Sequence, residues 1–202
     1  VDTAKFCIQC ISNFFLHAPH CVNLAGENRV AYPSIDNLNR ELEIVSQLPA
    51  SVVVHIGRVG KIEDVHKRLN KINIPTGQYT TNPYPLLLEN AAGQGTELGW
   101  TWEELRKIYE GVDKTRVGLC IDTQHTFASG LNKLESHEDV VKLFDKCEEV
   151  MGKKPNLIHL NDSKVEYESR KDRHENIGQG YIWNRDKSSL YSLLSICRDE
   201  NI

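Results

Sequence analysis

Five short apolar runs recur along the chain at intervals of 33 to 38 residues, and each ends in a histidine or an acidic residue. Continuous apolar runs of this length are typical of strands that are buried on both faces, as in parallel sheets. The interval is the length of one strand, one helix and their two loops. The sequence therefore predicts a repeated strand–helix unit. The five runs end at His17, His55, Glu89, Asp122 and His159.

The segments between these runs have the apolar spacing of helices that pack against a sheet. Ser34 is predicted to cap the first helix, and Pro49 stops it. Thr101 and Glu104 have the spacing of a capping box. The predicted helices are 34–48, 62–69, 101–111, 136–152 and one that starts near 187.

Alternating strands and helices indicate an α/β fold with a parallel sheet, which is either an open doubly wound sheet or a closed barrel. No G-x-G-x-x-G pattern follows a first strand, which weighs against a dinucleotide-binding fold. In a barrel, the carboxyl ends of all strands meet at one face and build the active site there. Five possible ligands at one structural position favour that convergence, although a single histidine after a strand is more often a core or surface residue. We therefore predict a (β/α)8 TIM barrel.

The predicted barrel is incomplete within this sequence. Only about five strand–helix units fit into 202 residues, whereas a closed barrel needs eight units and typically about 250 residues. We expect residues 1–202 to form a single TIM-barrel domain that is a fragment of a longer catalytic domain. In this interpretation the chain lacks the first strands and the last strand of the barrel.

The segment 157–180 concentrates residues that bind divalent transition metals. His159 ends its apolar run, and Asp172 and His174 follow within sixteen residues. Alternate residues of an extended chain point to the same side, so Asp172 and His174 can reach one ion. His125, three residues after Asp122, adds another imidazole. A solvated polar loop is the alternative, because isolated ligand spacings are often coincidental.

Composition indicates where the protein is located but says little about its chemistry. No apolar run reaches the roughly 18 residues that a transmembrane helix needs. Six cysteines without secretory features indicate reduced thiols in an intracellular protein, in the cytoplasm or the nucleus. The isolated pair Cys7 and Cys10 is interpreted as two positions on one helical turn rather than as a metal site.

The net charge of −4 does not by itself favour a nucleic-acid partner. Three bound divalent cations would reverse its sign, however, and local basic residues matter more for such a partner than the total. The basic residues beside the predicted ligands are Lys164, Arg170, Lys171 and Arg173.

Four longer segments of the chain resemble the motifs of a known family. The four segments are VNLA (22–25), LLLENAAGQGTELG (86–99), VGLCIDTQHTFASG (117–130) and IHLNDSK…SRKDRHENIGQG (158–180). They resemble endonuclease IV, the zinc-dependent apurinic/apyrimidinic endonucleases of DNA base excision repair, also called AP endonuclease family 2. The likeness extends from about His17 to Gly180 and implies an eight-stranded β/α barrel, in agreement with the pattern above.

The resemblance also implies a cluster of three zinc ions. One further Glu ligand of the second ion is expected beyond Ile202. The positions that match the family's ligands are His17 and His55 for the first ion, Asp122 and His159 for the second, His125, Asp172 and His174 for the third, and Glu89 as the bridge between the first and second.

The reaction implied by the resemblance is hydrolysis of the phosphodiester bond 5′ to an abasic site in double-stranded DNA. A hydroxide shared by two zinc ions attacks the phosphorus, and the third ion neutralises the departing 3′ oxygen. Glu89 is the catalytic residue in this scheme, since it bridges the two ions and adjoins the hydroxide. Removal of blocked 3′ ends, a 3′-phosphodiesterase activity, is also expected, and the protein is expected to act as a monomer.

Contacts to DNA are implied at four further positions. His20 and Cys21 occupy the place where the family commonly has an aromatic and an apolar residue that wedge into the duplex, so this chain departs from the pattern there. Gln94 is expected to position a phosphate or a ligand side chain, and Arg173 to contact the DNA backbone. The alternatives are a surface location for His20 and simple turn chemistry for Gln94.

Two other functions are compatible with the same residues. One is a two-metal barrel sugar isomerase, and the other is a zinc-dependent DNA-binding relative without turnover. The third ligand set and the nearby basic residues favour the endonuclease. Manganese is an alternative to zinc, because sets of histidine and carboxylate ligands accept both.

Overall fold

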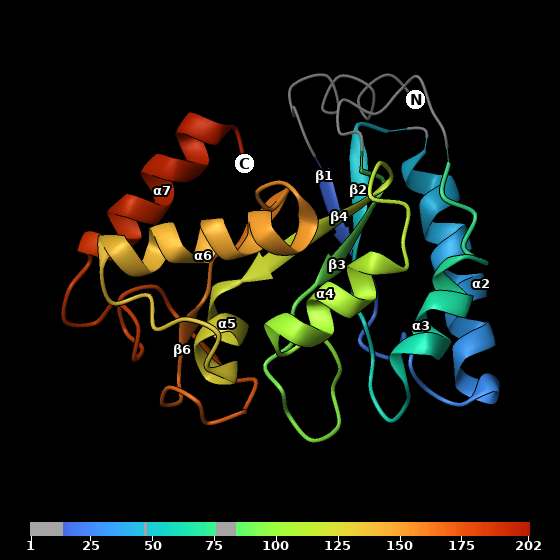
Figure 1. Ribbon diagram of the computed structural model, residues 1–202, viewed down its shortest axis with the longest axis horizontal. Helices are drawn as coiled ribbons and strands as arrows, with labels where there is room; N and C mark the ends of the chain where they lie inside the picture. Colours follow the sequence, from blue (N-terminus) through green and yellow to red (C-terminus); the bar gives the residue numbers. More distant parts are fainter. Residues whose placement is uncertain (1–13, 47, 76–83) are drawn as a thin grey trace, which may run out of the picture.

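The computed structural model describes residues 14–46, 48–75 and 84–202. Within it, five parallel strands form one sheet in chain order (Figure 1). Each strand ends at the residue that the sequence predicted as its last. The strands are β1 (Phe14–His17), β2 (Ala50–His55), β3 (Leu86–Glu89), β4 (Val117–Asp122) and β5 (Leu157–His159). The predicted helical turn at Cys7 and Cys10 lies outside the described residues.

Helices follow the strands and lie along the sheet one after another (Figure 1). A two-stranded antiparallel sheet, β6 (Asp162–Ser163) with β7 (His174–Glu175), lies in the loop after β5. Strands that neighbour one another in chain order, with a helix after each, confirm the predicted α/β TIM-barrel fold for the part of the barrel present here. The helices are α2 (Asn28–Val45), α3 (Ile62–Leu69), α4 (Trp102–Glu110), α5 (Thr123–Ser129), α6 (His137–Met151) and α7 (Ser188–Glu200).

The two faces of the sheet bury different sets of side chains. Residues such as Val54, Leu88 and Ile121 belong to the large core that includes the helices. The alternate residues Val53, Leu87 and Cys120 form a separate buried cluster on the other face, with Leu157 packed against it. Because side chains alternate along a strand, the terminal residue two positions after each of these three lies on that second face as well.

Helix α2 differs from the prediction. It begins at Asn28 rather than at Ser34 and ends at Val45 rather than at Leu48. The hydroxyl of Ser34 does not cap the helix, because it donates to the carbonyl oxygen of Val30, four residues earlier, at 2.8 Å. Apolar residues on both sides of Ser34 are buried against the sheet, and this packing outweighs the capping preference of serine. Those buried residues are Ala31, Ile35, Leu38, Leu42 and Val45.

The predicted capping box at Thr101 is only half formed. Thr101 accepts a hydrogen bond from the backbone N–H of Glu104 at 3.1 Å. The Glu104 carboxylate instead accepts from the N–H groups of Gly99 and Trp100, at 2.9 and 3.4 Å. It therefore fixes the chain before the helix rather than the cap residue itself.

A complete capping box is present at the start of α6. The Ser136 hydroxyl accepts from the Asp139 N–H at 3.1 Å, and the Asp139 carboxylate accepts from the Ser136 N–H at 3.1 Å. Replacing Ser136 by Ala is expected to lower the free energy of unfolding by about 1 kcal/mol, because the Asp139 N–H loses its acceptor. Urea denaturation measures the change. Ser195→Ala on the exposed face of α7 is the control, with an expected effect below about 0.5 kcal/mol; equal effects would contradict the role of the box.

Among the helices in the described residues, none is long and apolar enough to cross a bilayer.

Candidate metal centre

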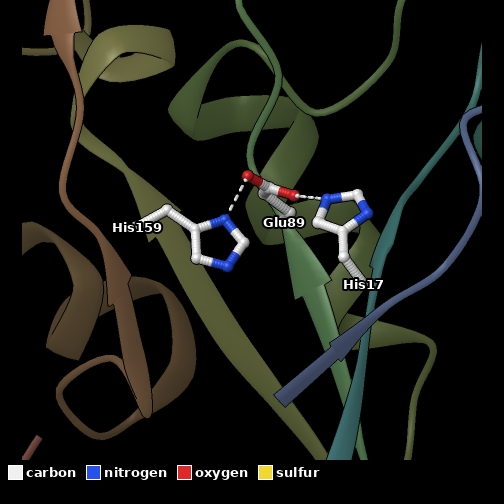
Figure 2. A group of neighbouring side chains, drawn as sticks. All are labelled: His17, Glu89 and His159. Carbon is white, nitrogen blue, oxygen red and sulfur yellow. Dashed lines mark hydrogen bonds and ion pairs between the residues drawn. The ribbon is translucent and has the colours of Figure 1, made fainter. Parts of the chain in front are cut away.

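Three histidines from three strands surround the carboxylate of Glu89 at the end of β3. Glu89 is 1% exposed. Its Oε2 lies 3.0 Å from His17 Nε2 and 3.5 Å from His55 Nε2, and its Oε1 lies 2.8 Å from His159 Nδ1. Figure 2 shows His17 and His159 approaching this carboxylate from opposite sides. Both oxygens of one buried carboxylate therefore meet imidazole nitrogens from other strands of the sheet.

A second group of side chains adjoins the first. Asp172 Oδ1 lies 3.4 Å from His125 Nε2 and 3.1 Å from His174 Nε2. His174 Nε2 also lies 4.0 Å from Asp122 Oδ2. His125 links the two groups, since its Nδ1 is 3.7 Å from Glu89 Oε1. All the residues predicted as ligands thus lie together; we call this set the ligand cluster: His17, His55, Glu89, Asp122, His125, His159, Asp172 and His174.

The closest groupings within the ligand cluster differ from the predicted sets. The cluster contains two groups of three residues, and within each group all ligand atoms lie within 4.8 Å of one another. His159 joins His17 because each bonds to a different oxygen of Glu89. The assignment of each residue to the first, second or third ion therefore stays a prediction. The two groups are His17, Glu89 and His159, and Asp122, His125 and His174.

The short helix α5 places Asp122 and His125 on the same side, and sequence analysis missed this helix. Asp122 ends β4 and caps α5, because its Oδ1 accepts from the His125 N–H at 2.9 Å. Residues three apart on a helix are neighbours on its surface. Gly130, at φ 85°, ends the helix in the left-handed conformation. An aspartate cap followed by a glycine eight residues later was the available signal.

Two asparagines that were not assigned as ligands hold Asp122 in place. The side-chain oxygen of Asn90 accepts from the Asp122 N–H at 2.7 Å. Asn161 Nδ2 donates to Asp122 Oδ2 at 2.6 Å. Both asparagines follow directly or closely after a strand that ends in a ligand. That position is the signal by which sequence analysis could have found the role of Asn161.

Backbone carbonyls fix the orientation of two imidazoles. A carbonyl can only accept, so His17 Nδ1 donates to Ala18 O at 2.7 Å and His125 Nδ1 donates to Asn90 O at 2.9 Å. In both rings Nε2 is left to face a carboxylate of the cluster. Histidines that bind metals are usually oriented in this way, with the other ring nitrogen bonded to a carbonyl or a carboxylate.

The spacing of the donor atoms fits a divalent transition metal. Two atoms that share a tetrahedral zinc ion at about 2.0 to 2.1 Å lie about 3.4 Å apart. The His–carboxylate pairs of the ligand cluster are mostly separated by 2.8 to 3.7 Å. Nitrogen and oxygen donors in this mixture suit zinc or manganese.

Burial and neighbouring charges shift the pKa values of the cluster in opposite directions. Burial lowers the pKa of His55 to about 4, so this ring is neutral at pH 7. Burial raises the pKa of Glu89, but hydrogen bonds from His159 and His17 outweigh it and hold the pKa well below its usual range. Hydrogen bonds from two histidines likewise hold the pKa of Asp172 far below its usual range. Both carboxylates are therefore ionised at neutral pH.

Three other imidazoles have raised pKa values. Burial lowers the pKa of His125, but the charge of Asp122 and the hydrogen bond with Asp172 raise it overall to about 10. The hydrogen bond with Glu89 raises the pKa of His17, and that with Asp172 raises the pKa of His174.

Binding of a divalent transition metal to the ligand cluster is therefore expected to release protons at pH 7 and to tighten as the pH rises. A ring with a raised pKa carries a proton at neutral pH, and that proton must leave before the nitrogen can bind a cation. Isothermal titration calorimetry in two buffers of different ionisation enthalpy measures the release. His125→Asn is expected to reduce it by about one proton, and a binding enthalpy that is the same in both buffers would contradict the prediction.

The positions predicted to contact DNA lie beside the ligand cluster. The His20 ring lies 5.4 Å from His17 and 5.5 Å from His55 between centroids. His20, Cys21 and Gln94 line a cavity of about 520 Å³ together with Asp172. Arg58, which was not predicted, lines it as well.

Gln94 and Arg173 are joined to each other. The Gln94 Oε1 accepts from the Asp172 N–H at 3.3 Å and from Arg173 Nη1 at 3.2 Å. Gln94 thus contacts the segment that carries two members of the ligand cluster. Its predicted role in positioning a ligand side chain stays a prediction.

Comparison with known proteins places the chain among TIM barrels. Residues 3–187 match the family described as xylose isomerase-like TIM barrel. The chain is 38% identical over 179 residues to the probable endonuclease 4 of Staphylococcus aureus (strain JH9), covering 85% of the chain and 59% of that protein. It therefore spans less than two thirds of the length of this curated relative.

Solved structures agree with that placement. The crystal structure of endonuclease IV from Thermus thermophilus superimposes with a TM-score of 0.73 at 28% identity, covering 92% of this chain and 65% of that one. The crystal structure of a D-tagatose 3-epimerase-like protein gives a TM-score of 0.69 at 19% identity, covering 99% and 73%. The second likeness shows the fold alone.

Proposed function

This chain belongs to the xylose isomerase-like TIM barrel family and, within it, to the endonuclease IV family, and we propose that it carries the catalytic centre of a DNA-repair AP endonuclease. The proposed substrate is double-stranded DNA with an abasic site. The proposed reaction is hydrolysis of the phosphodiester bond 5′ to that site. We further propose that residues 1–202 form one domain, because the larger of the two hydrophobic clusters includes residues from Ala18 to Leu193, and that the protein acts as a monomer.

The observation that carries the proposal is the environment of Glu89. A buried carboxylate with imidazole nitrogens at both oxygens is the arrangement expected of a ligand that bridges two cations. Buried charges are stable only when they are paired or bind metals. The second group around Asp172 supplies donors for a further cation.

We propose three zinc ions with the ligand sets that the family resemblance implies. His17, His55 and Glu89 would hold the first ion, with Glu89 shared by the second. When bound, such ions polarise the phosphate and lower the pKa of a coordinated water to near 7. The remaining ligands are Asp122 and His159 for the second ion and His125, Asp172 and His174 for the third.

The other residues of the site orient these ligands and exclude water. Asn90 and Asn161 hold Asp122 from two sides. The apolar residues Val53, Leu87 and Cys120 lie directly below the ligands in the strands and keep water from that side. Charges in such a dry environment interact more strongly than charges in water.

The cavity beside the ligand cluster is proposed to receive DNA. An enzyme that acts at one nucleotide of a duplex must take that nucleotide out of the stack. His20 can stack on a base, more weakly than a larger aromatic residue. Arg58 supplies positive charge at the cavity, and Arg173 supplies it at the segment between Asp172 and His174, where phosphates would lie.

Incubation with a defined duplex tests the proposal. The protein containing this chain is mixed with an end-labelled duplex that carries one tetrahydrofuran abasic-site analogue, with and without EDTA. We expect a nick 5′ to the analogue that leaves a 3′-hydroxyl, that EDTA abolishes and that added zinc restores. The same duplex with an intact nucleotide is the control. Absence of a chelator-sensitive nick would contradict the proposal, and binding without cleavage would favour a non-catalytic DNA-binding relative.

Two finer points need separate measurements. Elemental analysis of the purified protein is expected to give about three metal ions per chain, mainly zinc rather than manganese. A duplex with a 3′-phosphoglycolate end tests the proposed 3′-phosphodiesterase activity. Conversion of a ketose sugar without DNA cleavage would instead favour the barrel sugar isomerase.

A further inference from the structure

The loop that leads to Asp172 and His174 contains strained backbone. In the segment 164–173 between β6 and β7, Glu168 has φ 59° and Arg170 has φ 53°. Residues other than glycine are strained in this left-handed region and persist there only where their surroundings hold them. The contacts of these residues therefore show what fixes the loop.

One side of the loop is held by α5. The Arg170 N–H donates to Ala128 O at 2.8 Å, and the Glu168 N–H donates to Phe127 O at 3.3 Å. The buried Gln124 donates through Nε2 to Lys171 O at 3.0 Å. These are contacts to the backbone of the loop.

The other side of the loop is held by the side chain of Arg170. Its Nε donates to Gly93 O at 2.9 Å, and its guanidinium carbon lies 4.1 Å from the centroid of the Trp100 ring. A planar guanidinium can stack on an aromatic face while it donates at its edge. Gly93 and Trp100 thus form one binding surface for Arg170, which we call the Gly93–Trp100 platform.

The two parts of the Gly93–Trp100 platform pack against each other. Gly93 has φ 81°, and a Cβ at this position would lie 3.0 Å from the Trp100 ring, so the ring packs directly against the backbone. The Trp100 N–H donates to Glu104 at the start of α4. Arg170 therefore ties the loop to a fixed point in the barrel rather than to another part of the same loop.

We infer that Arg170 is a positioning residue for the cation-binding group His125, Asp172 and His174, through its contact with the Gly93–Trp100 platform. Asp172 is two residues after Arg170, and its N–H bonds to Gln94, the neighbour of Gly93. The platform thus sets where the Asp172 carboxylate meets the two imidazoles. This inference rests on the proposed metal centre.

Zinc binding to the metal-stripped protein tests the inference. Arg170→Met keeps much of the length of the side chain and removes the guanidinium. We expect two of three zinc ions to bind unchanged and one to bind about 10- to 100-fold more weakly, as is usual when a residue that orients a ligand is lost. Titration against a chromophoric chelator gives the affinities, and elemental analysis gives the number of ions.

Lys171→Met is the matched control, since it removes one positive charge from the next residue of the same loop. Loss of one positive charge favours cation binding equally in both variants. Weaker zinc binding in Arg170→Met but not in Lys171→Met would therefore show that Arg170 positions the ligands. Arg170→Lys is expected to recover part of the affinity, because an ammonium group can still lie over the Trp100 ring.

Other outcomes overturn the inference. These are unchanged binding in Arg170→Met, or equal weakening of all three ions. If Arg170→Met does not fold, Trp100→Leu against Trp100→Phe decides instead: one zinc ion weakened in Trp100→Leu and retained in Trp100→Phe supports the inference, and equal behaviour contradicts it. Wild-type protein that binds fewer than three ions would contradict the proposed metal centre. Wild-type protein that binds three ions, with unchanged binding in Arg170→Met, would contradict only the role of Arg170.

Discussion

Replacing Glu89 by Gln is expected to reduce the rate of cleavage of abasic DNA at least about 100-fold. Loss of a residue that only orients a metal ligand usually reduces activity about 10- to 100-fold, and Glu89 is proposed to bind the metals directly. The carboxylate bonds to His17 through one oxygen and to His159 through the other. The amide keeps one oxygen, but its nitrogen cannot bind a cation, and the charge that opposes the surrounding imidazoles disappears. Two of the three proposed zinc ions would lose their shared bridge, because one amide oxygen cannot replace a carboxylate that binds both.

The measurement is the rate of nicking together with the zinc content of each variant. We expect zinc content to fall from about three ions towards one. Glu110→Gln is the control, because it removes the same charge from the exposed end of α4. A Glu89→Gln variant with full zinc content and a wild-type rate would exclude a bridging role for this residue.

Replacing Asp162 by Ala is expected to lower the free energy of unfolding by about 4 kcal/mol or more, because four backbone N–H groups lose their acceptor at about 1 to 3 kcal/mol each. The Asp162 carboxylate is fully buried. It accepts hydrogen bonds from four backbone N–H groups, at 2.8 to 3.1 Å. Removal of the carboxylate leaves these four donors, three of them buried and one half-buried, without an acceptor. The donors belong to Ser163, Gly178, Gly180 and Ile182.

Urea denaturation measures the effect of Asp162→Ala. The loss of unfolding free energy in Asp162→Asn should be smaller than in Asp162→Ala. The amide keeps one acceptor oxygen but turns its NH₂ group toward backbone N–H donors. Asp145→Ala, on the exposed face of α6, should change the stability by less than about 0.5 kcal/mol. A loss in Asp162→Ala no larger than in the control would show that these donors find other partners.

The strands could be predicted from sequence because the central ones are buried on both faces. The runs before His55 and Glu89 are apolar almost throughout, so the first polar residue after each run marks the end of the strand. Helix boundaries were less predictable. Ser34 has the chemistry of a cap, but the burial of its neighbours extends α2 back to Asn28. Helix α5 is too short for an apolar period to be visible.

The members of the ligand cluster could be located from strand ends and from the family resemblance, whereas their contacts could not. The partners of Glu89 are 70 and 72 positions away in the chain. Their pairing depends on how the sheet curves and on the rotamers of buried side chains. The same holds for Gln94 and Asp172, which meet across 78 positions.

The alternation of side chains along β2, β3 and β4 has a consequence for which length changes this chain tolerates. Val53 and His55, Leu87 and Glu89, and Cys120 and Asp122 share one face. Insertion of a single residue between Leu87 and Glu89 would turn the carboxylate toward the helices and place an apolar side chain among the imidazoles. Insertions in the exposed turn around Thr115 meet no such constraint. Natural variants should therefore differ in length at the turns that join the units and stay invariant in length within the last residues of each strand.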